Sequence, residues 1–224
     1  MPLTSTARLA VDDAFARRQG AGRRLAEDSE LISRACRDMA ARFHRGGKLI
    51  VFGSGGAGTD ASHIAVEFMH PVIVGKRALP SIALSNDVST VTGVGARNGL
   101  AEAFAHQVRH WAGPGDMALG VSPDGRCATV LRGLEQAHEL GLFTLALVGG
   151  DGGPIAGSAA VDHVLVAGSA DPAVVKEIHV TAYHVLWELV HVFHAQYAVH
   201  GEPAPAGVHE GAGASGPARP EADR

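Results

Sequence analysis

The chain has 224 residues, 46% of them hydrophobic, and a formal net charge of -4 at pH 7. A chain of this length fits one domain with additions, and its apolar content is sufficient for a sizeable core. The basic residues are scattered and form no basic stripe, which argues against nucleic acid or an anionic membrane surface and favours a small-molecule partner.

Three features of the sequence predict a cytoplasmic protein. The apolar runs are far shorter than the roughly 20 residues that a membrane span needs. The first residues lack the uninterrupted apolar core of a signal peptide. Cys36 and Cys127 fit reduced thiols better than a disulfide framework.

The first 45 residues predict two helices, over 4–18 and 24–45. In the second helix, four apolar residues recur at spacings of four, three and four and form one stripe with charged residues between them: Ile32, Cys36, Met39 and Phe43. An apolar stripe of this kind has to be buried against another element.

From residue 46 onward, predicted strands and helices alternate. The expected strands cover residues 49–53, 80–84, 117–121, 143–148 and 162–166. The expected helices cover residues 60–70, 87–94, 100–111, 127–139 and about 172–197. This alternation predicts an α/β domain over 46–198, with a parallel sheet covered on both faces.

The last segment, residues 199–224, consists largely of Pro, Gly and Ala with charges and shows no apolar periodicity. Such a composition cannot bury enough apolar surface to offset the entropy of ordering. We therefore expect a disordered tail.

Two strand-to-helix junctions resemble anion-binding turns. The first glycine turn (residues 53–58) lies in "GSGGAGTDA", where glycine lets the backbone approach a ligand and the next helix directs its free N–H groups at it. The second glycine turn (residues 122–127) lies in "GVSPDGRCA" and carries Asp124 and Arg126. The spacing G-x-G-G-x-G differs from the dinucleotide fingerprint, so no nucleotide cofactor is expected. The alternative is that these glycines only make tight turns.

One helix turn beyond the first glycine turn, His63 and Glu67 are four residues apart and share a helix face, so both can reach one metal ion or one substrate carbon. An exposed pair of this kind is more often a solvated surface, but its position beside the turn favours a functional role.

The long C-terminal helix carries a second set of candidate residues, which recur at steps of seven: Glu177, His184 and His191. This periodicity alone does not select His184.

The chain from about residue 25 to 193 resembles the SIS (sugar isomerase) domain and, within it, the phosphoheptose isomerases, which convert sedoheptulose 7-phosphate to a glycero-manno-heptose 7-phosphate. The matching segments occur in the family's order and at its spacing: "GGKLIVFGSGGAGTDASHIAVEF", "RALPSIALSNDVSTVTGVG", "AFAHQV", "GDMALGVSPDGR" and "VVKEIHVTAYHVLWELVH". The resemblance implies a three-layer αβα sandwich with a five-stranded parallel sheet. It also implies a homotetramer whose N-terminal helices pack between subunits, with active sites at the interfaces. The stripe over residues 32–43 would then be buried by assembly.

The resemblance also implies roles for individual residues. Interconverting a ketose and an aldose moves a proton between C1 and C2 through an enediol, which requires an acid–base pair. Glu67 is implied as the base at carbon and His184 as the proton shuttle. His63, Glu67 and His184 are implied as zinc ligands, and the metal would polarise the carbonyl.

Several positions depart from the family pattern. Lys176 replaces a glutamine that binds zinc and substrate in the family, and a cation there would repel zinc, so we expect sub-stoichiometric metal. The second glycine turn loses hydroxyl donors and gains the charge of Asp124, which would repel a phosphate. The substrate-binding candidates are Ser54, Gly55, Gly56, Arg77, Arg97, Ser122, Asp124, Arg126 and Lys176.

Three functions remain open on these residues. The first is a sugar-phosphate isomerase with a shifted phosphate site, to which Lys176 and Arg97 contribute charge. The second is a non-catalytic SIS protein that binds a sugar phosphate or a partner protein. The third is an isomerase of a modified or nucleotide-linked sugar, for which Asp124 is the discriminating residue.

Overall fold

The computed structural model describes residues 5–200 and contains one sheet of five parallel strands in the order β2-β1-β3-β4-β5. The strands are β1 (Leu49–Gly53), β2 (Ser81–Ala83), β3 (Met117–Ser122), β4 (Phe143–Val148) and β5 (His163–Val166). Every residue of β1, β3 and β4 is buried, as expected for central strands covered on both faces. The predicted parallel sheet is confirmed.

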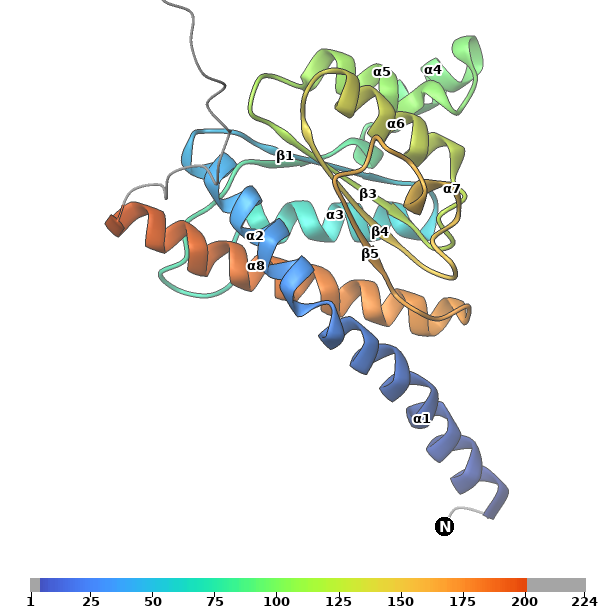
Figure 1. Ribbon diagram of the computed structural model, residues 1–224. Coiled ribbons are helices and arrows are strands. Elements are labelled where there is room, and N and C mark those ends of the chain that lie inside the picture. Colours follow the sequence, from blue (N-terminus) through green and yellow to red (C-terminus); the bar gives the residue numbers. More distant parts are fainter. Residues whose placement is uncertain (1–4, 201–224) are drawn as a thin grey trace, which may run out of the picture.

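Helices cover both faces of this sheet (Figure 1). The long helices are α1 (Ser5–Glu27), α2 (Ser29–His44), α3 (Gly56–Met69), α4 (Val88–Asn98), α5 (Glu102–Trp111), α6 (Ala128–Glu139) and α8 (Pro172–His200). The short ones are α7 (Gly153–Ala156) and the 3-10 helix η1 (Leu84–Asn86), neither of which the sequence pattern predicted. The three-layer αβα sandwich is confirmed.

Alternation along the strands produces two separate cores. Leu49 and Val51 of β1 belong to the core that α2, α3 and α8 complete. Ile50 and Phe52 belong to the opposite core, which is completed mainly by α5, α6 and α7. Successive side chains of a strand point to opposite faces, so each strand contributes to both layers.

The apolar stripe of α2 is buried within the chain itself. Ile32, Cys36, Met39 and Phe43 are all buried, and the Phe43 ring stacks on Phe68 of α3 at 5.5 Å. The expectation that assembly would bury this stripe is wrong, because α8 lies along α2 and Cys36 reaches the backbone oxygen of Leu186. Apolar residues in the α1 segment remain exposed instead, as at Leu9 and Phe15.

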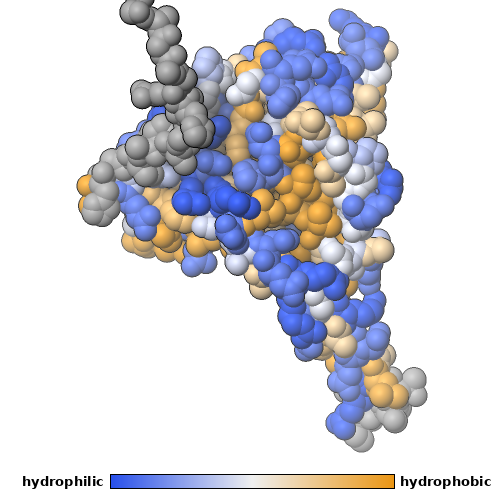
Figure 2. Space-filling model, in the orientation of Figure 1, coloured by the Kyte–Doolittle hydropathy of each residue, from blue (hydrophilic) through white to orange (hydrophobic). Residues whose placement is uncertain are grey.

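Helix α1 runs without interruption through the glycines at 20 and 22, where the sequence pattern had predicted a break. The helix is continuous because Ala21 and Leu25 are buried against the body. Its N-terminal part projects away from the sandwich (Figure 1), and its visible surface is mostly hydrophilic (Figure 2).

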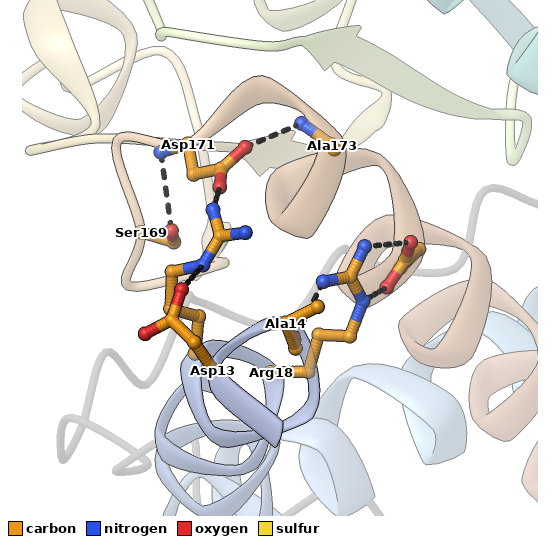
Figure 3. A network of polar contacts seen from close by, with 8 residues as sticks. Asp13, Ala14, Arg18, Ser169, Asp171 and Ala173 are labelled. Atoms are coloured by element: carbon orange, nitrogen blue, oxygen red, sulfur yellow. Dashed lines mark hydrogen bonds and ion pairs between the residues drawn. The ribbon is translucent and has the colours of Figure 1, made fainter. Parts of the chain in front are cut away.

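Three arginines of α1 bond α8 and the residues just before it, and Figure 3 shows two of these contacts, at Asp171 and on α8. Arg17 bonds Asp171, and the Arg18 guanidinium bonds both carboxylate oxygens of Glu177 at 2.6 and 2.8 Å. Arg24 bonds the backbone oxygen of Gly168. Ion pairs and hydrogen bonds thus add to the contacts of the buried Ala21 and Leu25 in positioning α1.

Helices α3, α4 and α8 extend beyond their predicted bounds, and α4 does so by four residues, to Asn98. Helix α3 begins at Gly56, four residues before the predicted start, so the first glycine turn leads directly into its first helical turn. Helix α8 continues to His200, and the rest of the predicted tail lies outside the described residues. None of the described helices has the length and hydrophobicity needed to cross a membrane.

Candidate active site

A pocket of about 420 Å³ opens at the carboxyl ends of β1 and β2. Crevices outside the carboxyl ends of the strands are the usual ligand sites of parallel α/β sheets. The lining comes from the first glycine turn, α3, η1, α4, the turn before α5, and α5: Gly53, Ser54, Gly55, Gly58, Thr59, Ser62, Ser85, Asn86, Val91, Leu100 and Phe104.

The first glycine turn leaves open space at its centre. Gly55 has a φ of 58°, and a Cβ added there would meet no atom within 4 Å. Two hydrogen bonds connect the start of this turn to η1. The Ser85 hydroxyl donates to the Gly53 oxygen at 2.7 Å and accepts from the Gly53 amide at 3.2 Å. The Ser62 hydroxyl donates to Asn86 at 2.6 Å. The lining is thus uncharged and combines hydroxyl and amide groups with the apolar side chains of Val91, Leu100 and Phe104, which suits a sugar.

Three predicted residues meet between α3 and α8 within one chain, and none of them is among the pocket-lining residues. His63, Glu67 and His184 each offer a ligand atom, and these atoms all lie within 4.8 Å of one another. His63 Nε2 lies 3.2 Å from Glu67 Oε1, and the His63 and His184 rings meet edge to face at 5.2 Å. The acid and the imidazole come from different helices, α3 and α8, so a small ligand can contact both.

Hydrogen bonds determine which nitrogen of His184 is available. Its Nδ1 lies 2.8 Å from the backbone oxygen of Val180, and a carbonyl can only accept, so Nδ1 carries the proton. The Nε2 lone pair is then open, as a proton shuttle or metal ligand requires.

The residue before His184, Tyr183, contacts the other histidine of the cluster. Its hydroxyl oxygen lies 2.8 Å from His63 Nδ1. Burial, with the Asp60 and Glu67 carboxylates, raises the pKa of Tyr183 to about 12, so the phenol keeps its proton.

Lys176 is bonded away from this cluster, at the first turn of α3. Its Nζ donates to the Asp60 carboxylate at 2.6 Å, to the Thr59 hydroxyl at 3.0 Å and to the Gly56 oxygen at 3.1 Å. These three acceptors match the three N–H bonds of an ammonium group. Lys176 and Gly56, both predicted to bind substrate, are thus brought together, and the buried Asp60 carboxylate is a further acceptor for Lys176.

The second glycine turn is satisfied by its own residues. Asp124 Oδ1 accepts from the Arg126 amide at 2.9 Å and from the Ser122 hydroxyl at 3.3 Å. The Arg126 guanidinium bonds Asp151 at 2.8 and 2.9 Å. The donors that a bound anion would use are therefore already engaged by Asp124, and none of the pocket-lining residues comes from this turn.

The two remaining candidates lie apart from the lining. The backbone oxygen of Arg77 is 3.1 Å from Nε2 of His191, about two helical turns beyond His184 on α8. Burial, followed by the charge of Arg77, lowers the pKa of His194 there. Arg97 is exposed in the last turn of α4. Within one chain, neither arginine is among the pocket-lining residues.

Several site residues were not identified from the sequence. Ser85 and Asn86 directly follow β2, and the rule that ligands bind at the carboxyl ends of parallel strands could have found them. Asp60 and Tyr183 gave a weaker signal. Asp60 precedes Glu67 by seven residues and Tyr183 follows Lys176 by seven, so each shares a helix face with a residue already singled out.

Comparison with known proteins is consistent across sequence and structure. Residues 17–149 match the SIS domain family. The chain is 36% identical to a phosphoheptose isomerase of Solidesulfovibrio magneticus over 180 residues, 80% of this chain and 85% of that one. It is 41% identical to one of Chlorobaculum tepidum over 166 residues, 73% and 78% of the two chains. The solved structure of a phosphoheptose isomerase from Francisella tularensis superimposes with a TM-score of 0.76 at 28% identity, covering 85% of this chain and 100% of that one.

Proposed function

Because the chain belongs to the SIS domain family, and within it to the phosphoheptose isomerases, we propose that it is an aldose–ketose isomerase acting on sedoheptulose 7-phosphate or a close relative of that sugar. One observation carries the proposal. Ligand atoms of Glu67 and His184 lie within 4.8 Å of each other, on two helices, and His63 beside them directly follows Ser62 of the pocket lining.

The geometry supports a proton transfer through an enediol. The Glu67 carboxylate takes the proton from the carbon next to the carbonyl and returns it to the neighbouring carbon. The open Nε2 of His184 takes a proton from one oxygen and delivers it to the other, since its Nδ1 is bonded to Val180. Two groups on separate helices can flank the reacting carbons, and protons are conserved over the cycle.

The pocket supports binding of the rest of the sugar. The hydroxyls of Ser54, Thr59 and Ser62 and the amide of Asn86 can exchange hydrogen bonds with a polyol chain. Free N–H groups in the first turn of α3 favour an anionic group nearby. Substrate binding by Ser54, Gly55 and Gly56 is part of this proposal.

The residues present fit a zinc ion through three ligands. Two imidazole nitrogens and a carboxylate oxygen form a common donor set for zinc in catalytic sites, and His63, Glu67 and His184 are close enough to share one ion. Lys176 does not join them, because its ammonium group is bonded to Asp60. We propose that zinc binds there weakly, below one ion per chain. When bound, it would polarise the substrate carbonyl.

We also propose a cytoplasmic homotetramer in which α1 packs between subunits and neighbouring chains complete the site. The projecting α1, with Leu9 and Phe15 exposed, supports this assembly. Arg77 and Arg97, absent from the pocket lining of their own chain, could then serve a neighbour's site. The free cysteines fit a reducing compartment, and burial raises the pKa of Cys36 to about 12.

One observation favours a second candidate. Asp124 holds the donors of the second glycine turn, so this turn suits a hydroxyl or amine better than a phosphate. An isomerase of a modified sugar, lacking phosphate at that end, would need such a carboxylate.

Proton exchange in heavy water tests the proposed function directly. We expect the wild-type protein to introduce solvent deuterium into sedoheptulose 7-phosphate, and Glu67→Gln to slow this exchange about 10³-fold with the fold intact. Glu188→Gln, an exposed change on α8, is the matched control and should exchange normally. Normal exchange by Glu67→Gln would remove Glu67 from the mechanism. A wild-type protein that exchanges no ketose phosphate would contradict isomerase function on this substrate class.

A further inference from the structure

A chain of hydrogen bonds links α8 to the proposed base. The Tyr183 hydroxyl lies 2.8 Å from His63 Nδ1, and His63 Nε2 lies 3.2 Å from Glu67 Oε1. Tyr183 is 2% exposed, so its hydroxyl is shielded from water. A phenol, an imidazole and a carboxylate are thus connected in series across two helices.

The chemistry of the two ends determines where the protons lie. An ionised carboxylate only accepts, so the hydrogen between His63 and Glu67 belongs to Nε2. A neutral imidazole has one N–H, so Nδ1 is then an acceptor and Tyr183 is its donor. The opposite arrangement would direct the Nε2 lone pair at the carboxylate. It would also leave the proton of a buried hydroxyl with no acceptor among the described residues, at a cost of about 1–3 kcal/mol.

The two adjacent histidines therefore hold opposite tautomers. His184 carries its proton on Nδ1, bonded to Val180, and presents a lone pair at Nε2. His63 carries its proton on Nε2 and presents a donor to Glu67. His184 is thus equipped to shuttle a proton, whereas His63 is equipped to orient the carboxylate.

We propose that Tyr183 is a positioning residue, which fixes the His63 tautomer that holds Glu67 in place for proton abstraction. This inference rests on the proposed function, in which Glu67 is the base. It has a second consequence. A metal ion binds an imidazole nitrogen through its lone pair, so zinc has to displace the Nε2 proton of His63. Tyr183 favours the competing tautomer and therefore weakens zinc binding.

The test is Tyr183→Phe, with Tyr197→Phe as the matched control. Tyr197 is the other tyrosine of the chain, also on α8, and its hydroxyl bonds the backbone oxygen of Arg37 on α2, outside the site. Nitrogen-15 NMR, with His63 assigned through His63→Gln, reports the tautomer without substrate. We expect the Nε2–H form in the wild type and in Tyr197→Phe, and a mixture of both forms in Tyr183→Phe.

Two further measurements complete the test. In Tyr183→Phe we expect kcat to fall about tenfold with KM unchanged, and zinc affinity to rise about tenfold. A wild-type His63 with its proton on Nδ1, or a loss of zinc affinity in Tyr183→Phe, would show Tyr183 to be an acceptor and overturn the proposal. An unchanged tautomer in the variant would also overturn it. Failure of the isomerase assay alone would leave the NMR result standing, so the two failures are distinguishable.

Discussion

The two glycine turns look alike in sequence and differ in use. Each follows a buried strand and leads into a helix. The first borders an open pocket, and a Cβ on Gly55 would meet nothing within 4 Å. The second is packed against the segment after β4, and a Cβ on Gly125 would lie 1.9 Å from the backbone oxygen of Gly152. A glycine in such a turn is therefore found both beside open space and against packed backbone, and only the fold shows which of the two applies.

The ion pairs at the two turns also differ, in how far their side chains are exposed to water. At the first, Lys176 is bonded to Asp60, whose side chain is 5% exposed. At the second, Arg126 pairs with Asp151, and both side chains are more than half exposed. Burial makes the first pair a structural element and leaves the second largely screened by water.

The largest expected contrast is in stability. Gly55→Ala and Gly125→Ala both place alanine at positive φ, 58° and 69°, which costs on the order of 1–3 kcal/mol of backbone strain in each. Only Gly125→Ala adds a collision with backbone, so its free energy of unfolding should fall by at least about 2 kcal/mol more. Urea denaturation followed by circular dichroism measures the difference. Equal losses would show that the second turn can move away from Gly152.

A smaller contrast is expected between the two ion pairs. Lys176→Met leaves the buried Asp60 carboxylate without its cation and should lower the free energy of unfolding by about 1–3 kcal/mol. Arg126→Met removes a solvent-exposed pair and should change it by less than about 1 kcal/mol.

A double variant sharpens the test of the first pair. Adding Asp60→Asn to Lys176→Met removes the unpaired charge, so much of the lost stability should return in the same denaturation experiment. If the two changes instead add independently, Lys176 and Asp60 are not coupled.

Sequence reasoning recovered the fold because the signal for it is local. Continuous apolar runs such as residues 49–52 and 143–148 predict fully buried strands, and the alternation with helices predicts a parallel sheet. It failed where tertiary contacts decide. Gly20 and Gly22 looked like a helix break, but the burial of Ala21 carries α1 through them. The α2 stripe looked unpartnered because its partner, α8, is about 150 residues later in the chain.

The same distinction between local patterns and tertiary contacts applies to the site residues. His63 and Glu67 follow from their spacing, since both lie on one face of one helix. His184 could be selected only through the family resemblance, because other histidines of α8 share its periodicity. Tyr183 and Lys176 acquire their roles from partners 120 and 116 residues away, and no local pattern encodes those contacts.

The smallest expected effect concerns substrate binding at the second turn. In Asp124→Ser, the Arg126 amide and the Ser122 hydroxyl lose their carboxylate acceptor, and the local negative charge is removed. If the phosphate of the substrate can reach this turn, KM for a ketose phosphate should fall about fivefold, or roughly 1 kcal/mol, with kcat unchanged. Asp151→Ser is the control, because it removes a neighbouring charge and frees the Arg126 guanidinium but leaves the Arg126 amide and the Ser122 hydroxyl bonded to Asp124. An equal fall in KM in both variants would mean that the loss of negative charge lowers KM, and not the release of the two donors. An unchanged KM in Asp124→Ser would mean that the phosphate binds elsewhere, leaving the first turn as the better candidate.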